Sequence, residues 1–139
     1  MNNLQLIVDN GQWTIDNENL YDMNKNIIKE KSYAFAVKIV IACTDLTTVK
    51  KEFVLSRQLL RSGTAIGALV REAEQAESKA DFIHKLSIAL KEANETEYWL
   101  ALMQDTKLIS SSIFDELNTM VIELLRLLTS IIKSSKANR

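Results

Sequence analysis

The side chains best suited to metal binding and to nucleophilic catalysis are rare in this sequence, which contains one histidine, His84, and one cysteine, Cys43. His84 follows Asp81 by three residues, a spacing that on a helix places two potential metal ligands on one face. Di-iron sites in helical bundles need a Glu-x-x-His motif on each of two helices and further glutamates on the others. One such pair is not enough, so we expect His84 to be a surface residue and the chain to bind no metal or other cofactor.

Nucleophilic catalysis has little support either. A Ser–His or Cys–His pair would have to use His84, and no recognisable motif surrounds a candidate serine. Cys43 lies in an apolar run, which favours a place in the core. Gly63 and Gly67 lie within a helical pattern, so they predict a close approach between helices and not a phosphate-binding loop. We therefore predict no enzymatic activity, no catalytic residue and no small-molecule substrate.

The composition favours one helical domain. The 139 residues include no proline and only three glycines, the two residue types that most strongly interrupt helices. A single cysteine allows no disulfide within the chain. The longest apolar run, residues 34–43, is shorter than the ~18–20 residues that a membrane span needs, and the N-terminus lacks the pattern of a signal peptide. We expect a cytoplasmic protein that does not bind membranes.

The spacing of apolar residues predicts four long helices, and capping signals mark where two of them begin. Ser78 followed by Asp81, and Ser112 followed by Asp115, resemble capping boxes with aspartate at the last position. Short connections between long helices favour an all-α fold, an antiparallel up-down-up-down four-helix bundle over residues 24–139. The expected helices cover residues 24–47, 51–77, 78–107 and 112–134.

The first 23 residues differ from the rest of the chain. They hold four acidic residues and no basic one, which gives this segment a charge of −4 and leaves +3 on the remainder of a chain whose net charge is −1. Asn10-Gly11 between two apolar stretches suits a β-hairpin turn, but an isolated hairpin is marginal in water. We predict an acidic, flexible tail over residues 1–23, with a hairpin as the alternative.

One ion pair between helices is also predicted. If the second and third helices fold back on each other at Glu77-Ser78, Arg61 lies level with Asn94 or Glu95. We predict an ion pair between Arg61 and Glu95, because a guanidinium and a carboxylate can form a planar, bidentate contact. Its expected role is to fix the register of the two helices. The alternative is that both side chains are solvated separately.

Two helices carry more apolar surface than one bundle needs. Residues 34–43 and 120–132 are apolar nearly all round the helix, and a helix of that kind is usually buried all round. A small bundle would leave part of this surface exposed, and such patches usually mark interfaces. We predict a homo-oligomer built through the first and last helices, with a monomer that has scattered surface leucines as the alternative. The predicted interface residues are Phe35, Ile39, Ile122, Leu125 and Ile132.

Basic residues on the first two helices suggest a second kind of surface. In a ring-shaped oligomer, even a weakly basic subunit would repeat its charge around the ring and form a surface for phosphates. We predict nucleic-acid binding through Lys29, Lys38, Arg57 and Arg71, with a solvated helix face as the alternative. A continuous basic face would favour nucleic acid as the partner, and a mixed or acidic face would favour a protein.

The central region carries blocks whose order and spacing match a known family. They are Gln58-Leu59-Leu60-Arg61-Ser62, Ile66-Gly67-Ala68, Ser78-Lys79-Ala80-Asp81-Phe82 and Leu86-Ser87-Ile88-Ala89. With residues 27–36 and 128–133, they resemble the bacterial four-helix bundle proteins associated with intervening sequences of 23S ribosomal RNA. The resemblance covers roughly residues 26–136. It departs at Leu69-Val70-Arg71, where relatives commonly have an Asn-Ile pair followed by acidic residues.

The resemblance implies an antiparallel four-helix bundle that assembles as a homopentamer. Similar bundles are the accessory variability determinant proteins of diversity-generating retroelements, whose basic pentamers bind nucleic acid and a polymerase. We therefore expect a non-enzymatic oligomeric scaffold or adaptor. Its expected partner is RNA or DNA, or a nucleic-acid-associated protein such as a reverse transcriptase. The alternative is a protein-interaction or structural module that binds no nucleic acid.

Overall fold

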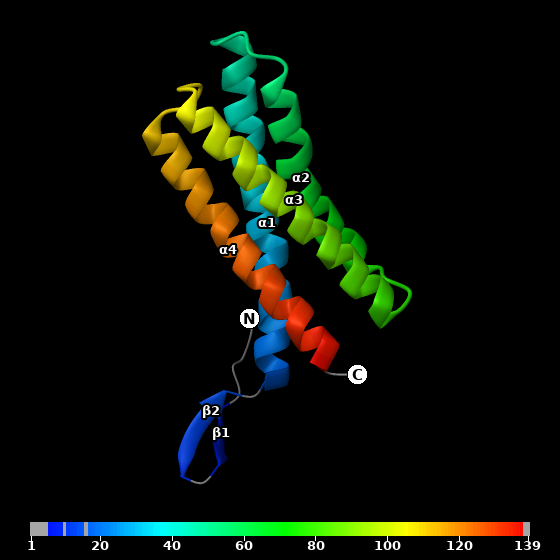
Figure 1. Ribbon diagram of the computed structural model, residues 1–139. Coiled ribbons are helices and arrows are strands. Elements are labelled where there is room, and N and C mark those ends of the chain that lie inside the picture. The colour runs from blue at the N-terminus through cyan, green and yellow to red at the C-terminus, as the bar shows by residue number, and fades with distance from the viewer. Residues whose placement is uncertain (1–5, 10, 16, 138–139) are drawn as a thin grey trace.

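The computed structural model describes residues 6–9, 11–15 and 17–137 of the chain, and four long helices make up most of it (Figure 1). The predicted all-α four-helix bundle is confirmed. A short β-hairpin precedes the helices. In chain order the elements are β1 (Leu6–Asp9), β2 (Gln12–Ile15), α1 (Asn17–Thr48), α2 (Leu55–Glu74), α3 (Lys79–Asp105) and α4 (Ser111–Ala137).

Each helix packs against the next one in the chain, and α1 also packs against α4, which closes the bundle. Figure 1 shows the α1–α2 and α3–α4 connections at one end of the bundle and the α2–α3 turn at the other. Burial of a large apolar side chain contributes roughly 1.5–3 kcal/mol, so the core is the main source of stability. Its largest fully buried side chains include Phe35, Ile39, Leu59, Ile66, Leu86, Leu100, Met103, Leu124, Leu128 and Ile131. No described helix has both the length and the apolar character needed to span a bilayer.

The first helix begins at Asn17, seven residues before the expected start at residue 24. The added turns are tied to the end of the last helix, because the hydroxyl groups of Tyr21 and Ser135 lie 2.8 Å apart and form a hydrogen bond. The ammonium of Lys25 lies over the rings of Tyr21 and Phe82, 4.9 and 5.1 Å from their centroids. The expected division of the chain at residue 23 therefore falls inside α1, because these contacts between distant segments extend the helix.

The N-terminal hairpin is antiparallel, with Leu6 opposite Ile15 and Asp9 opposite Gln12. Gly11 has a φ of +75°, a conformation that glycine adopts without strain. The structure thus forms the hairpin that the sequence offered as the alternative, while residues 1–5 of the expected tail lie outside the described residues. Figure 1 shows the hairpin projecting from the N-terminal end of α1, away from the bundle.

The starts of α3 and α4 are capped by side chains. The backbone N–H of Asp81 donates to Ser78 Oγ at 3.0 Å, so the predicted cap of α3 is confirmed. The predicted cap of α4 at Ser112 is wrong. That helix begins at Ser111, and the N–H of Ile113 donates to Ser110 Oγ at 3.2 Å. Residues 110–112 are all serine, and their identity alone does not indicate which of them caps the helix.

Candidate interaction surfaces

Exposed apolar side chains gather on a surface formed by α1 and α2. Three of them, at positions i, i+4 and i+7 of α1, share one side of that helix. Two more come from the start of α2 and from the loop before it. We refer to these five residues, Tyr33, Val37, Val40, Phe53 and Leu60, as the α1–α2 face. Their side chains are between 39% and 58% exposed.

The two helices are brought together by small and medium-sized side chains beneath this face. A Cβ atom at Gly63 would lie 2.9 Å from Ile39 Cγ1 and Cγ2, closer than real contacts allow, so glycine is needed there for α2 to approach α1. Towards the loop end, Val40, Phe53 and Leu60 line one shallow cavity of about 260 Å³ together with Arg57. The α1–α2 face is therefore a continuous, slightly hollowed surface.

Two arginines lie on the α1–α2 face. The guanidinium carbon of Arg71 lies 5.3 Å from the ring centroid of Tyr33, a cation–π contact. Arg57 is exposed and lines the shallow cavity. Among the described residues, neither arginine forms an ion pair with a carboxylate. The face thus combines apolar surface with two positive charges that no carboxylate of the described part of the chain neutralises.

Unlike the two arginines, each of the two lysines predicted to bind nucleic acid is paired with a carboxylate. The Nζ atom of Lys29 lies 3.1 Å from a carboxylate oxygen of Glu74 on α2, and that of Lys38 lies 2.9 Å from one of Glu116 on α4. These pairs lie on opposite sides of α1. The four predicted residues therefore do not form a continuous basic face within the subunit. Lys29 borders the α1–α2 face, one turn before Tyr33, but its charge is paired with Glu74. Among the described residues, Arg57 and Arg71 therefore carry the unpaired positive charge of this largely apolar surface.

The predicted oligomer interface needs correction at α1. Phe35 and Ile39 are completely buried in the core of the single subunit, and Ile132 is only 8% exposed, so they offer little or no surface to a second copy. The reason is that α1 carries two apolar stripes, and the prediction chose the one that the bundle itself buries. Ile122 and Leu125 on α4 are half-buried, and their role in an interface stays a prediction.

The predicted ion pair between Arg61 and Glu95 is confirmed, and Glu92 joins it. One guanidinium nitrogen of Arg61 donates to both carboxylate oxygens of Glu92 at 3.1 and 3.2 Å, and another donates to Glu95. Partial burial alone would lower the pKa of Arg61, but the two carboxylates raise it above its ordinary value. Glu92 lies one turn before Glu95 on the same side of α3, and this spacing could have identified it.

The side chains with potential for chemistry are not assembled into a site. Cys43 is buried and its Sγ donates to the Ser56 carbonyl at 3.4 Å. Burial, and then the charge of Glu52, raise the pKa of the thiol to about 11, so it is protonated at neutral pH. His84 is exposed. Within the described ranges there is no group of three metal-ligating side chains.

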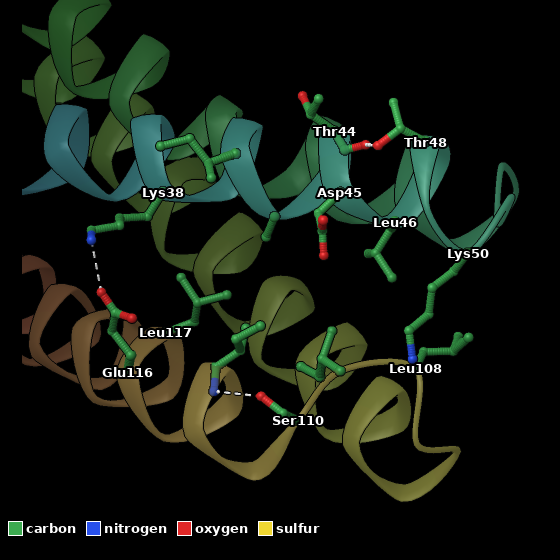
Figure 2. Close-up of a pocket in the computed structure, with 14 residues that line it drawn as sticks. Lys38, Thr44, Asp45, Leu46, Thr48, Lys50, Leu108, Ser110, Glu116 and Leu117 are labelled. Carbon is green, nitrogen blue, oxygen red and sulfur yellow. Dashed lines mark hydrogen bonds and ion pairs between the residues drawn. The ribbon is translucent and has the colours of Figure 1, made fainter.

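A second hollow lies between the end of α1 and the start of α4. It has a volume of about 500 Å³ and is lined by apolar and polar residues in equal number, the apolar ones including Ile41, Leu46, Leu108, Ile113 and Leu117. Figure 2 shows Lys38 reaching Glu116 across this groove and Lys50 reaching the loop before α4, where its Nζ donates to the Lys107 carbonyl at 3.4 Å. Lys38, Glu116 and Lys50 are thus engaged within the subunit, and apolar atoms make up most of the exposed lining of the groove.

Comparison with known proteins identifies relatives of the bundle. Residues 24–130 match the family model described as 23S rRNA-intervening sequence protein. A crystal structure of a protein of unknown function from the S23 ribosomal protein family of Bacteroides thetaiotaomicron has 55% sequence identity and a TM-score of 0.78. The match covers 79% of this chain and 98% of that chain. No curated protein matches the sequence. The expected similarity to retroelement accessory proteins stays a prediction.

Proposed function

Because the chain belongs to the 23S rRNA-intervening sequence protein family, we propose that it is a non-enzymatic helical scaffold that assembles with copies of itself. The homopentamer implied by the resemblance is the proposed form. The observation that carries this proposal is the α1–α2 face, since monomeric proteins seldom leave apolar side chains gathered on one surface. Scattered single residues would need no explanation, but these five are continuous.

Burial of the α1–α2 face would favour association. Full burial of a valine, leucine or phenylalanine contributes roughly 1.5–3 kcal/mol, and these side chains are about half exposed in the subunit. Each would therefore add on the order of 1 kcal/mol if a second copy covered it. Together, these burial free energies offset part of the free-energy cost of the translational and rotational freedom that is lost on association. This face is the proposed contact surface, in place of the buried Phe35 and Ile39.

The test compares two tyrosines with nearly equal exposure on different surfaces. Tyr33 on the α1–α2 face is 58% exposed and Tyr98 on α3 is 60% exposed. In light scattering, the unaltered chain and the Tyr98→Asp variant are expected to give the same multiple of the 15.8 kDa subunit mass. Tyr33→Asp places a charge on the face and is expected to give smaller species. A 15.8 kDa species from the unaltered chain at micromolar concentration would contradict the proposal.

Nucleic acid is the second candidate partner, supported by Arg57 and Arg71, which pair with no carboxylate in the described ranges, and by the description of the family. Each phosphate contact adds roughly −0.7 to −0.9 to the slope of log affinity against log salt. With an RNA oligonucleotide, Arg57→Ala is expected to weaken binding and to reduce that slope by about one contact. Lys38→Ala serves as the control, because Lys38 is already paired with Glu116. No salt-dependent binding would favour a protein partner, such as the expected reverse transcriptase.

A further inference from the structure

The strands of the β-hairpin stand apart from the four-helix bundle of the subunit (Figure 1). The hairpin lies outside residues 24–130, which match the family. Among the described residues, the only extensive contacts of its strands are with each other. A hairpin of two four-residue strands is marginal in water and usually needs a surface to pack on. We therefore expect the hairpin to be covered by another surface.

The composition of residues 1–16 indicates which kind of surface could cover the hairpin. Residues 1–16 contain several large apolar residues, including Trp13, together with two acidic residues, Asp9 and Asp16, and no basic one. The α1–α2 face has the complementary composition, because it is apolar and carries Arg57 and Arg71, for which the described residues provide no carboxylate partner. Apolar surfaces with opposite charges favour association and set its orientation.

We propose that the hairpin of one copy docks on the α1–α2 face of another copy. This inference rests on the proposed function, because it names what covers the face in the self-assembled protein. The apolar side chains of the hairpin would pack over the hollow lined by Val40, Phe53 and Leu60. Asp9 and Asp16 would pair with the two arginines, which suit carboxylates because a guanidinium can bind both oxygens.

The length of the chain excludes docking on the same copy. Only residue 16 separates the end of β2 at Ile15 from the start of α1 at Asn17. The 16 residues of helix between Asn17 and Tyr33 span about 24 Å, and Tyr33 is the nearest residue of the face. A four-residue strand extends only about 13 Å. The hairpin cannot reach its own face, so the acceptor is a second copy.

Docking of this kind is head-to-tail, because each copy contributes its hairpin to one neighbour and its α1–α2 face to another. Such heterologous contacts close into rings when the rotation between copies permits. The proposed homopentamer would therefore contain five equivalent hairpin contacts. The acidic segment becomes part of the assembly, where its charge and the two arginines offset one another.

The first experiment reverses charge on each side in the full-length chain. Asp9→Arg with Asp16→Arg, and separately Arg57→Asp with Arg71→Asp, are each expected to raise the dissociation constant of the oligomer about tenfold or more, equivalent to ~1.4 kcal/mol. Combining all four substitutions is expected to restore much of the affinity. Asp22→Arg is the matched control, because it reverses an exposed acidic residue on α1 beyond the hairpin. Circular dichroism checks that each variant retains its helices.

A second measurement follows Trp13 directly. In a Trp99→Phe variant, Trp13 is the only tryptophan, and the substitution loses no hydrogen bond that the structure describes, because the buried Trp99 Nε1 has no partner among the described residues. Dilution through the dissociation constant is expected to shift the emission of Trp13 to the red as the hairpin leaves the face. An emission that stays the same through dissociation would contradict the inference.

The outcomes separate this inference from the proposed function. If Tyr33→Asp dissociates the oligomer while reversal of Asp9 and Asp16 leaves the dissociation constant within about twofold, the α1–α2 face mediates assembly without the hairpin. In that case the inference fails and the proposed function stands. If the unaltered chain is monomeric, both fail. If reversal on either side weakens assembly and the combined variant restores it, both are supported.

Discussion

Arg71 of α2 lies over the ring of Tyr33 of α1, with its guanidinium carbon 5.3 Å from the ring centroid. The contact joins the two helices at one end of the α1–α2 face. It also limits the positions that both long side chains can adopt before any partner binds, which reduces the ordering that association would require. Sequence reasoning had assigned Arg71 to nucleic-acid binding. Within the subunit, its described contact is with an aromatic ring.

The first prediction concerns the strength of this contact. A cation–π pair at an exposed site contributes roughly 0.5–1 kcal/mol. In a double-mutant cycle of Arg71→Ala and Tyr33→Leu, measured by chemical denaturation at fixed protein concentration, we expect a coupling energy within that range. Arg57→Ala is the matched control, since no ring contact is described for Arg57, and its coupling to Tyr33→Leu is expected to be near zero. Equal couplings for the two arginines would contradict the assignment.

The second prediction concerns the close approach of α2 to α1. Gly63→Ala adds a Cβ atom that would meet two carbons of the buried Ile39 side chain at 2.9 Å. The strain of overpacking, roughly 1–3 kcal/mol, opposes the gain of ~1 kcal/mol in helix propensity. We expect net destabilisation of about 1 kcal/mol, measured by thermal or chemical denaturation.

A second substitution tests whether Ile39 is the cause. Ile39→Ala creates a cavity and is costly by itself, by about 2–5 kcal/mol. In its background the added methyl group at position 63 has space, so Gly63→Ala is expected to become neutral or stabilising. If Gly63→Ala destabilises the protein equally in both backgrounds, a contact other than Ile39 sets the requirement for glycine.

Much of this architecture was predictable from the sequence, because helices and their connections depend on local patterns. The period of the apolar residues predicts the four helices, and a turn at Glu77-Ser78 then places Arg61 level with Glu95. The same reasoning could not decide which stripe of α1 faces the core, since both are apolar. The structure shows that the narrow space at Gly63 accommodates Ile39, and this leaves Tyr33 and Val40 on the surface.

Contacts that depend on exact side-chain geometry were not predictable. The buried hydroxyl of Thr96 donates to Ser62 Oγ at 2.9 Å or to the Glu92 carbonyl at 2.7 Å, next to the Arg61 ion pairs. Serine and threonine are common in helices, and nothing in their spacing distinguishes a contact between helices from a bond to the preceding turn. The extension of α1 towards Asn17 was missed for a similar reason, because Tyr21 meets Ser135 from the far end of the chain.

The third prediction concerns the proposed register role of Arg61. Its side chain is half exposed, so solvent screens its ion pairs and their contribution to stability is small, about 1 kcal/mol or less. A double-mutant cycle of Arg61→Ala and Glu95→Ala is expected to give a coupling energy in that range at low salt and a smaller one at 1 M salt. A coupling that does not change with salt would indicate packing instead of charge.

The last prediction concerns pH and Glu52, which caps α2 from the preceding loop. Its carboxylate accepts hydrogen bonds from the backbone N–H groups of Val54, Leu55 and Ser56 at 3.1, 2.9 and 2.8 Å. Burial alone would raise the pKa of Glu52, but these bonds stabilise the charged form and hold the pKa below its ordinary value of 4.5. Because the pKa is lower in the folded state, the carboxylate stabilises the protein above pH 4.5, and this contribution is lost as pH falls through the folded-state pKa.

Glu52→Gln removes the charge and weakens the cap, so we expect a loss of about 1 kcal/mol in the free energy of unfolding at pH 7. The difference from the unaltered protein is expected to shrink as pH falls below 4.5, because Glu52 itself then becomes neutral. Urea denaturation at a series of pH values from 7 to 3 measures both the loss at pH 7 and its decrease at low pH. Glu30→Gln, at an exposed position of α1 with no ion pair among the described residues, is the control and is expected to show little change. A difference at Glu52 that stays constant over this range would mean that the shape of the side chain, and not its charge, caps the helix.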